Sequence, residues 1–89
     1  MPYRIDISPS AQKEIKSLRG YVHAQAVKLI DSLAENPRPA RAKELREKRN
    51  IYRIWLAAKW RIVYEIEDEF QIVIVMRVRR KEQINYESL

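Results

Sequence analysis

Arginine recurs on one face of three consecutive strand-like segments, as Arg53, Arg61 and the pair Arg77 and Arg79, and Trp55 lies on the first of these segments. The planar guanidinium fork suits bidentate contact with phosphate, and an indole ring offers a surface on which a nucleobase can stack. These residue types in this pattern indicate a groove for single-stranded RNA or DNA.

The remaining composition narrows the chemistry that such a groove can perform. The 89 residues include no Cys and one His, so thiol catalysis, serine triads and His/Cys metal sites are unsupported. RNA carries its own nucleophile, the 2′-hydroxyl, and an enzyme need only align it, deprotonate it, neutralise the phosphorane and protonate the leaving oxygen. Arg and Lys side chains with one Tyr suffice for this, and we expect no metal or other cofactor.

A simpler interpretation of the arginines is that they only form ion pairs. The arginines Arg53, Arg61 and Arg79 would then pair with the acidic residues Glu65, Glu67 or Glu82. For each arginine alone the two interpretations are equally good, and the clustering of all of them on one face favours a functional site.

The N-terminal part of the sequence predicts a strand and two helices, which would support this face. Tyr3 to Ile7 alternates like a half-buried strand, and Ser8-Pro9 is typical of a helix start. Apolar residues then recur at helical spacing up to Gly20, which predicts the end of that helix. A second helix is expected from Val22 until Asn36-Pro37 ends it.

The second half predicts a sheet. Residues 37–50 form a basic connector in which Leu45 is the only sizeable apolar group, and strand-like runs follow at Ile51 to Leu56, Trp60 to Ile66 and Phe70 to Val78. We therefore expect one α+β domain over residues 1–89, in which a helical hairpin packs on one face of an antiparallel three-stranded meander with an N-terminal strand.

Strand alternation sorts the side chains of the meander into two faces. The set predicted to pack on the helices is Tyr52, Ile54, Leu56, Trp60, Ile62, Tyr64, Ile66, Ile72, Ile74, Met76 and Val78. The opposite set, which carries the arginines, is Ile51, Arg53, Trp55, Arg61, Val63, Glu65, Val73, Val75, Arg77 and Arg79.

Charge supports a polyanionic partner. The net charge is +6, and residues 37–61 contain nine basic and two acidic side chains, an excess of seven positive charges. No apolar run is long enough to span a membrane or to serve as a signal peptide, so we expect a cytoplasmic protein without membrane contact.

Five stretches of the sequence are informative together: Tyr3 to Ala11, Leu33 to Pro39 with Leu45, Tyr52 to Ile54, Trp60 to Ile66, and Val78 to Lys81 followed by Tyr86. In this order and spacing they resemble the RelE/ParE superfamily across nearly the whole chain. The resemblance implies the toxin of a type II toxin–antitoxin system, with a cognate antitoxin as partner. In the RelE-like branch, which is favoured, it implies ribosome-dependent cleavage of mRNA to a 2′,3′-cyclic phosphate and a 5′-hydroxyl.

The resemblance also implies roles for individual residues. Arg53 would contact the scissile phosphate, Arg61 would stabilise the transition state, and Arg80 or a neighbour, Arg79 or Lys81, would assist the leaving group. Tyr86 would stack on a base or act as general base, although it is nearly as well explained as an apolar anchor of the tail. The wider RNA-binding set is expected to be Lys43, Arg46, Lys48, Arg49, Trp55, Lys59, Arg77, Arg79 and Lys81.

Two departures from the family pattern keep the mechanism open. Trp55 stands where members of the RelE-like branch usually carry a second basic residue, and Ala57-Ala58 replace the usual turn glycine. Lys59 is a possible substitute for the missing cation. A gyrase inhibitor of the ParE type, which binds without cutting RNA, is the alternative, and a nonenzymatic module that binds operator DNA together with the antitoxin is a third possibility.

Overall fold

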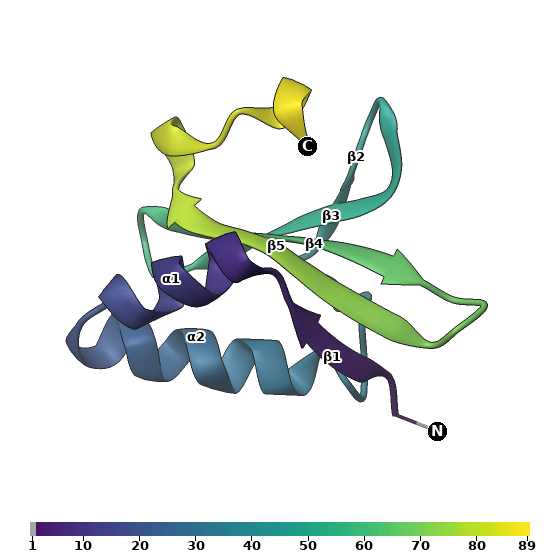
Figure 1. The fold of residues 1–89 in the computed structure, drawn as a ribbon, viewed down its shortest axis with the longest axis horizontal. Coiled ribbons are helices and arrows are strands. Elements are labelled where there is room, and N and C mark those ends of the chain that lie inside the picture. The colour runs from purple at the N-terminus through teal and green to yellow at the C-terminus, as the bar shows by residue number, and fades with distance from the viewer. Residues whose placement is uncertain (1) are drawn as a thin grey trace.

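The computed structural model describes residues 2–89 and has two layers, a helical hairpin and a five-stranded sheet (Figure 1). The strands are β1 (Arg4–Ile7), β2 (Lys43–Leu45), β3 (Lys48–Leu56), β4 (Trp60–Glu67) and β5 (Ile72–Arg80). They lie in the order β1-β5-β4-β3-β2, with β1 parallel to β5 and every other pair antiparallel. The predicted α+β class and the meander β3-β4-β5 are confirmed.

The helices α1 (Pro9–Ser17) and α2 (Gly20–Ser32) cover one face of this sheet. Ser8 caps α1 by accepting a hydrogen bond from the amide of Ala11, as its position before Pro9 predicts. Gly20 does not end α1, which was the expectation; it has φ +59° and is the first residue of α2. No helix in residues 2–89 is long and apolar enough to cross a membrane.

Strand β2 was missed, because the sequence predicts a basic connector there. Its three residues read Lys-Glu-Leu and pair with β3 through Lys43↔Arg53 and Glu44↔Tyr52. A short, charged strand at the edge of a sheet has no apolar alternation to reveal it. Its pairing turns the expected connector into a hairpin with β3.

The core lies between the helices and the sheet, and for one strand the predicted face was wrong. Val73 and Val75 are fully buried in the core, whereas Ile72, Ile74 and Met76 are half-buried and lie outside it. The register explains this, because Val63 pairs with Arg77 while the next residue, Tyr64, pairs with Val75. Met76 is therefore the extra residue of a β-bulge, and one inserted residue inverts the alternation along the rest of the strand.

Past the bulge and in the other strands the predicted faces are confirmed. Ile54, Leu56, Ile62, Tyr64, Ile66 and Val78 all lie in the core cluster, and Tyr52 and Trp60 pack against it. The predicted face of the N-terminal strand is confirmed too, since Ile5 and Ile7 of β1, and Tyr3 just before it, pack against the same cluster.

A polar network fastens the loop after α2 to the far end of the sheet. Arg38 donates two hydrogen bonds to the carboxylate of Asp68, of 3.1 and 2.7 Å, and its Nε donates to the hydroxyl of Tyr52. The two hydrogen bonds from Arg38 to this carboxylate, together with one from the hydroxyl of Tyr3, lower the pKa of Asp68 to about 2. The hydroxyl of buried Tyr64 donates to the carbonyl of Pro37 at 2.8 Å.

Because the phenol of Tyr64 is buried, we expect the folded state to lose stability at alkaline pH. Burial raises the pKa of its phenol above the ordinary 10.0, so the stability linked to this group is fully present below about pH 10 and is lost as the pH rises further. We expect Tyr64→Phe to lower the free energy of unfolding at pH 7 by about 1 kcal/mol, because the bond to Pro37 is lost, and to weaken the decline above pH 10. Urea unfolding from pH 7 to 11.5 measures both. Tyr21→Phe, at a residue that is 68% exposed, is the control and should change neither.

Candidate nucleic-acid interface

The side of the sheet away from the helices carries a cavity lined by cations. It has a volume of about 180 Å³ and is lined by Arg41, Lys43, Arg53, Ile54, Trp55 and Arg61. The sheet register puts these groups together, because Lys43 pairs with Arg53 across β2 and β3, and Trp55 pairs with Arg61 across β3 and β4. Four of the six lining residues are cationic and none is acidic, so the cavity suits an anion.

Arg61 is the buried one of the four cations that line this cavity, and it is the most unusual residue of the site. Its side chain is 6% exposed, yet it has no acidic partner among residues 2–89. Its guanidinium stacks on the ring of Trp55, with 4.2 Å from Cζ to the ring centroid, and one terminal nitrogen donates to the hydroxyl of Tyr86 at 3.1 Å. The Nε has no hydrogen-bond partner within the described chain. The simple ion-pair interpretation is therefore wrong for Arg61.

The tail after β5 contacts two of the residues that line the cavity, Arg61 and Trp55. It leaves the sheet on the face opposite the helices and runs toward the β2-β3 hairpin (Figure 1). Tyr86 thereby reaches Arg61, and the ammonium of Lys81 lies 5.8 Å from the ring centroid of Trp55. The Nζ of Lys48 donates to the carbonyls of Glu87 and Leu89, at 3.4 and 2.6 Å, which fastens the end of the tail to β3.

Apart from Arg80, the predicted site residues divide into four groups. Those that meet around the cavity are Lys43, Arg53, Trp55, Arg61, Lys81 and Tyr86. Arg46 and Lys48 lie beside it, lining a second hollow of about 240 Å³ together with Tyr86. Arg77 and Arg79 are ion-paired with Glu14. Lys59 and Arg49 are exposed and line neither cavity.

Arg80 lies apart from the other predicted catalytic residues. It pairs with Trp60 across β4 and β5, and its guanidinium is 5.5 Å from the centroid of that ring. Because Trp60 packs against the core under the helices, Arg80 belongs to the opposite face of the sheet from Arg61. Of the three basic candidates at the end of β5, Lys81 is the one beside Trp55 and the cavity.

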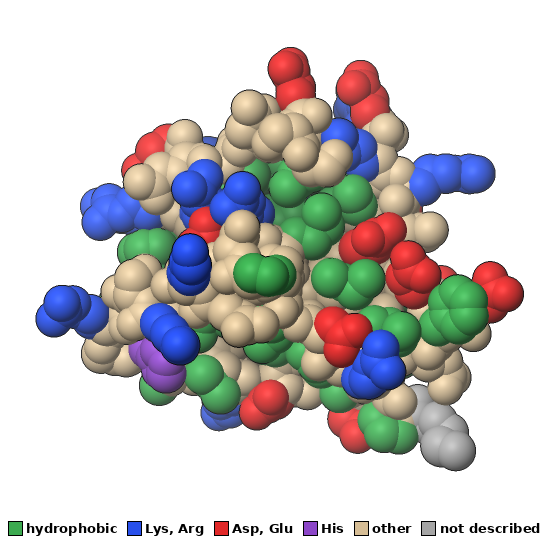
Figure 2. All heavy atoms as spheres, in the orientation of Figure 1, with side chains coloured by type: hydrophobic (Ala, Val, Ile, Leu, Met, Phe, Trp, Pro, Cys, Tyr) green, Lys and Arg blue, Asp and Glu red, His purple; other side chains and the backbone are tan. Residues whose placement is uncertain are grey.

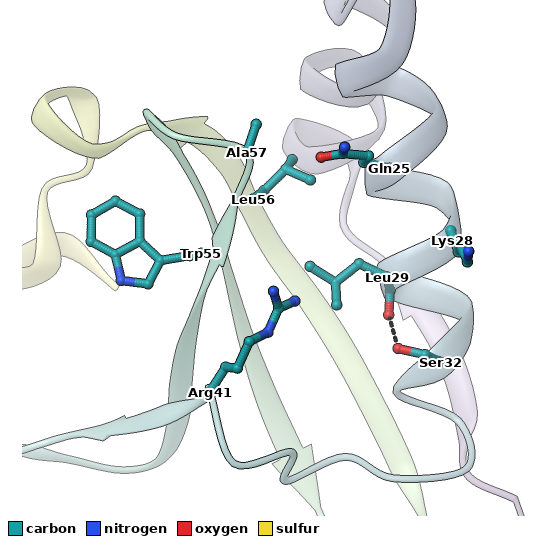
Figure 3. A pocket seen from close by; sticks show the side chains of 8 residues that line it. All are labelled: Gln25, Lys28, Leu29, Ser32, Arg41, Trp55, Leu56 and Ala57. Carbon is teal, nitrogen blue, oxygen red and sulfur yellow. Dashed lines mark hydrogen bonds between the residues drawn. The ribbon is translucent and has the colours of Figure 1, made fainter.

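Arg41 was not among the predicted site residues, although it belongs to the basic segment 37–61. It lines the cationic cavity and also a larger hollow of about 360 Å³ at the sheet edge, between α2 and β3. Figure 3 shows its guanidinium directed toward Leu29 and Leu56, while the indole of Trp55 turns to the other side of β3. Figure 2 shows basic side chains more abundant on the left of this view and acidic ones toward the β4-β5 hairpin on the right.

Solved structures share this architecture. The isolated E. coli RelE toxin is 32% identical, with a TM-score of 0.79, covering 97% of this chain and 92% of that one. In the intact E. coli RelBE toxin-antitoxin complex the matching chain is 32% identical, with a TM-score of 0.79 and coverage of 91% and 99%. The archaeal RelE-RelB complex from Pyrococcus horikoshii OT3, 19% identical with a TM-score of 0.80 and coverage of 94% and 100%, shows the shared fold alone. The molecule is thus a RelE-like toxin in its class.

Sequence comparison identifies the family. A family model described as the ParE toxin of type II toxin-antitoxin system, parDE, matches residues 5–85. A search of curated protein sequences finds no match. The chain therefore belongs to the ParE toxin family within the RelE/ParE superfamily, and it is a toxin of a type II toxin–antitoxin system on the RelE-like branch.

The burial of Arg61 predicts a gain in stability when its charge is removed. A buried guanidinium without an acidic partner costs desolvation energy that a side chain of similar length and no charge avoids. We expect Arg61→Met to raise the free energy of unfolding by about 1 kcal/mol, measured by urea unfolding. Arg19→Met, at an exposed arginine between the helices, should stay within about 0.5 kcal/mol of the wild type. A clear loss of stability in Arg61→Met would contradict this account.

Proposed function

We propose that this toxin is an mRNA endonuclease that acts on the ribosome and cuts without a metal ion or cofactor. The observation that carries the proposal is the buried guanidinium of Arg61, which faces a cationic cavity and has no acidic partner within the described residues. A fold retains such a costly group when it is needed for an anion, and the anion with the matching chemistry is an RNA phosphate.

In the proposed reaction, every bond and proton is accounted for, and side chains around the cavity stabilise the charge that develops. The 2′-oxygen of the RNA attacks the adjacent phosphorus and loses its proton, the bond from phosphorus to the 5′-oxygen breaks, and that oxygen takes up a proton. The products are a 2′,3′-cyclic phosphate and a 5′-hydroxyl. Arg61 and Arg53 neutralise the charge that develops on the phosphorane, and the ammonium of Lys81 donates the proton to the leaving oxygen.

Trp55 and Tyr86 have the complementary role of holding the RNA. Trp55 is 43% exposed, and with Arg61 on one side of its ring it is a rigid stacking surface for a base. Tyr86 contacts Arg61 through its hydroxyl and either stacks on a base or accepts the proton of the 2′-hydroxyl. The positions expected for stacking and for phosphate contact therefore adjoin each other.

The ribosome and mRNA are proposed partners, and so is a cognate antitoxin that silences the toxin. Relatives from E. coli and P. horikoshii were solved as complexes of RelE with RelB, which supports an antitoxin here. The basic segment 37–61 supports a further proposal that the complex of toxin and antitoxin binds operator DNA through phosphate contacts.

Arg61→Ala tests the cleavage directly. Primer extension on a reporter mRNA in a reconstituted translation system, with and without ribosomes, should show ribosome-dependent cuts by the wild type. We expect the variant to cut at least about 100-fold more slowly, because a donor to the transition state is lost. Arg61→Lys keeps the charge without the fork and should fall between the two, while Arg19→Ala should cut like the wild type.

The same assay distinguishes RNA cleavage from the second candidate function, which is inhibition of DNA gyrase. The match to the ParE family favours inhibition of DNA gyrase by binding alone. If the well-folded wild type cuts no RNA with ribosomes present, the nuclease proposal fails, and inhibition of gyrase supercoiling becomes the function to measure.

A further inference from the structure

The carboxylate of Glu14 on α1 joins the helical layer to the arginine-bearing face of the sheet. One of its oxygens accepts a hydrogen bond from the backbone amide of Val78 at 2.8 Å. The other receives the guanidinium groups of Arg77 and Arg79, at 3.0 and 2.6 Å. Its side chain is 16% exposed, so these contacts are largely shielded from solvent.

The topology explains why a side chain is needed at this place. Strand β1 pairs with β5 only from Arg4↔Ile72 to Ile7↔Val75, so the outer edge of β5 has no strand partner at Val78. The chain has turned into α1 by then, and Glu14 supplies the acceptor that the next residue of a longer strand would have supplied. The backbone amide of Val78, two residues before the end of β5, is thereby satisfied.

The contact continues from Glu14 into the tail. The Nε of Arg79 binds Glu14, and its Nη1 donates to the carbonyl of Gln83 at 3.1 Å, in the first turn after β5. That turn spans Lys81–Gln83, and three residues further on Tyr86 meets Arg61. Glu14 therefore orients Arg79, Arg79 holds the start of the tail, and the tail carries Lys81 and Tyr86 to the cavity.

We propose that Glu14 is a positioning residue of the RNA-cleaving site, and this inference rests on the proposed function. Glu14 holds the tail in register through Arg79. Its single negative charge offsets one of the two positive charges of Arg77 and Arg79 and engages both guanidinium groups, so that phosphate binding is left mainly to the cations of the cavity. Within residues 2–89, Glu14 is the acidic residue that forms ion pairs with arginines of this face. It does not line the cavity.

This role predicts opposite effects on binding and on cleavage, which a general loss of folding does not produce. Glu14→Gln keeps an oxygen acceptor for the amide of Val78 and removes the charge. The two released arginines can then take up phosphate, so RNA should bind as tightly as before or more tightly. A plot of the logarithm of the RNA-binding constant against the logarithm of the salt concentration should become steeper by about 0.7 for each new phosphate contact. Cleavage should slow, because Lys81 and Tyr86 are no longer held.

The experiment compares the full-length wild type, Glu14→Gln and Glu35→Gln, the last of which removes one charge at an exposed residue. It measures kcat for ribosome-dependent cleavage, affinity for a short 2′-O-methyl RNA that cannot be cut, thermal unfolding, and amide hydrogen exchange of residues 81–89. For Glu14→Gln we expect a kcat at least ten-fold lower, undiminished RNA affinity, a Tm within a few degrees, and exchange in residues 81–89 at least ten-fold faster. Glu35→Gln should match the wild type in all four.

Two results overturn the inference. One is unchanged kcat and unchanged exchange of the tail in Glu14→Gln. The other is a joint fall of kcat, RNA affinity and Tm, which indicates general unfolding. If the wild type itself does not cut RNA, the proposed function fails, and the exchange of residues 81–89 still decides whether Glu14 holds the tail.

Discussion

The burial of Arg61 without an acidic partner is the constraint on which the arrangement of this molecule depends. Removing a guanidinium from water is costly, and here the compensation is one hydrogen bond to Tyr86 and the ring of Trp55 rather than a carboxylate. The apolar core on the other face of the same strands has to offset that cost. Ile62, next to Arg61 in β4, is fully buried in that core, so neighbouring residues of one strand serve opposite purposes.

The arginines differ in whether a carboxylate binds them. Arg38 is bound to Asp68 and Tyr52 and fastens the loop after α2, while Arg77 and Arg79 are bound to Glu14 at the edge of β5. Arg61 and its neighbours in the cavity lack acidic partners within the described chain. A guanidinium paired with a carboxylate contributes to the fold, and one that is buried unpaired is available to an anionic ligand. Charge alone does not make this distinction.

Residues with a regular local pattern were predicted correctly, and those placed by irregular or distant contacts were not. The helix cap at Ser8 and the outward face of Arg53, Trp55 and Arg61 follow from spacing alone. The bulge at Met76 leaves no signal, because its residues are as apolar as those of a regular strand, and so Val73 and Val75 were assigned to the wrong face. Arg80 lies on the helix-side face, two residues after Val78, as the predicted alternation implies, although it was expected to be catalytic.

By itself, the sequence determined the α+β class, the helical hairpin and the face of the meander that bears arginine, because these depend on periodicities of two and 3.6 residues that every segment carries locally. Only the tertiary structure decided which of those cations are free. That outcome depends on Glu14, which is 65 residues from Arg79, and on a tail that folds back to place Tyr86 on Arg61. Such pairings between distant residues leave no periodic trace, since they are selected by packing in three dimensions.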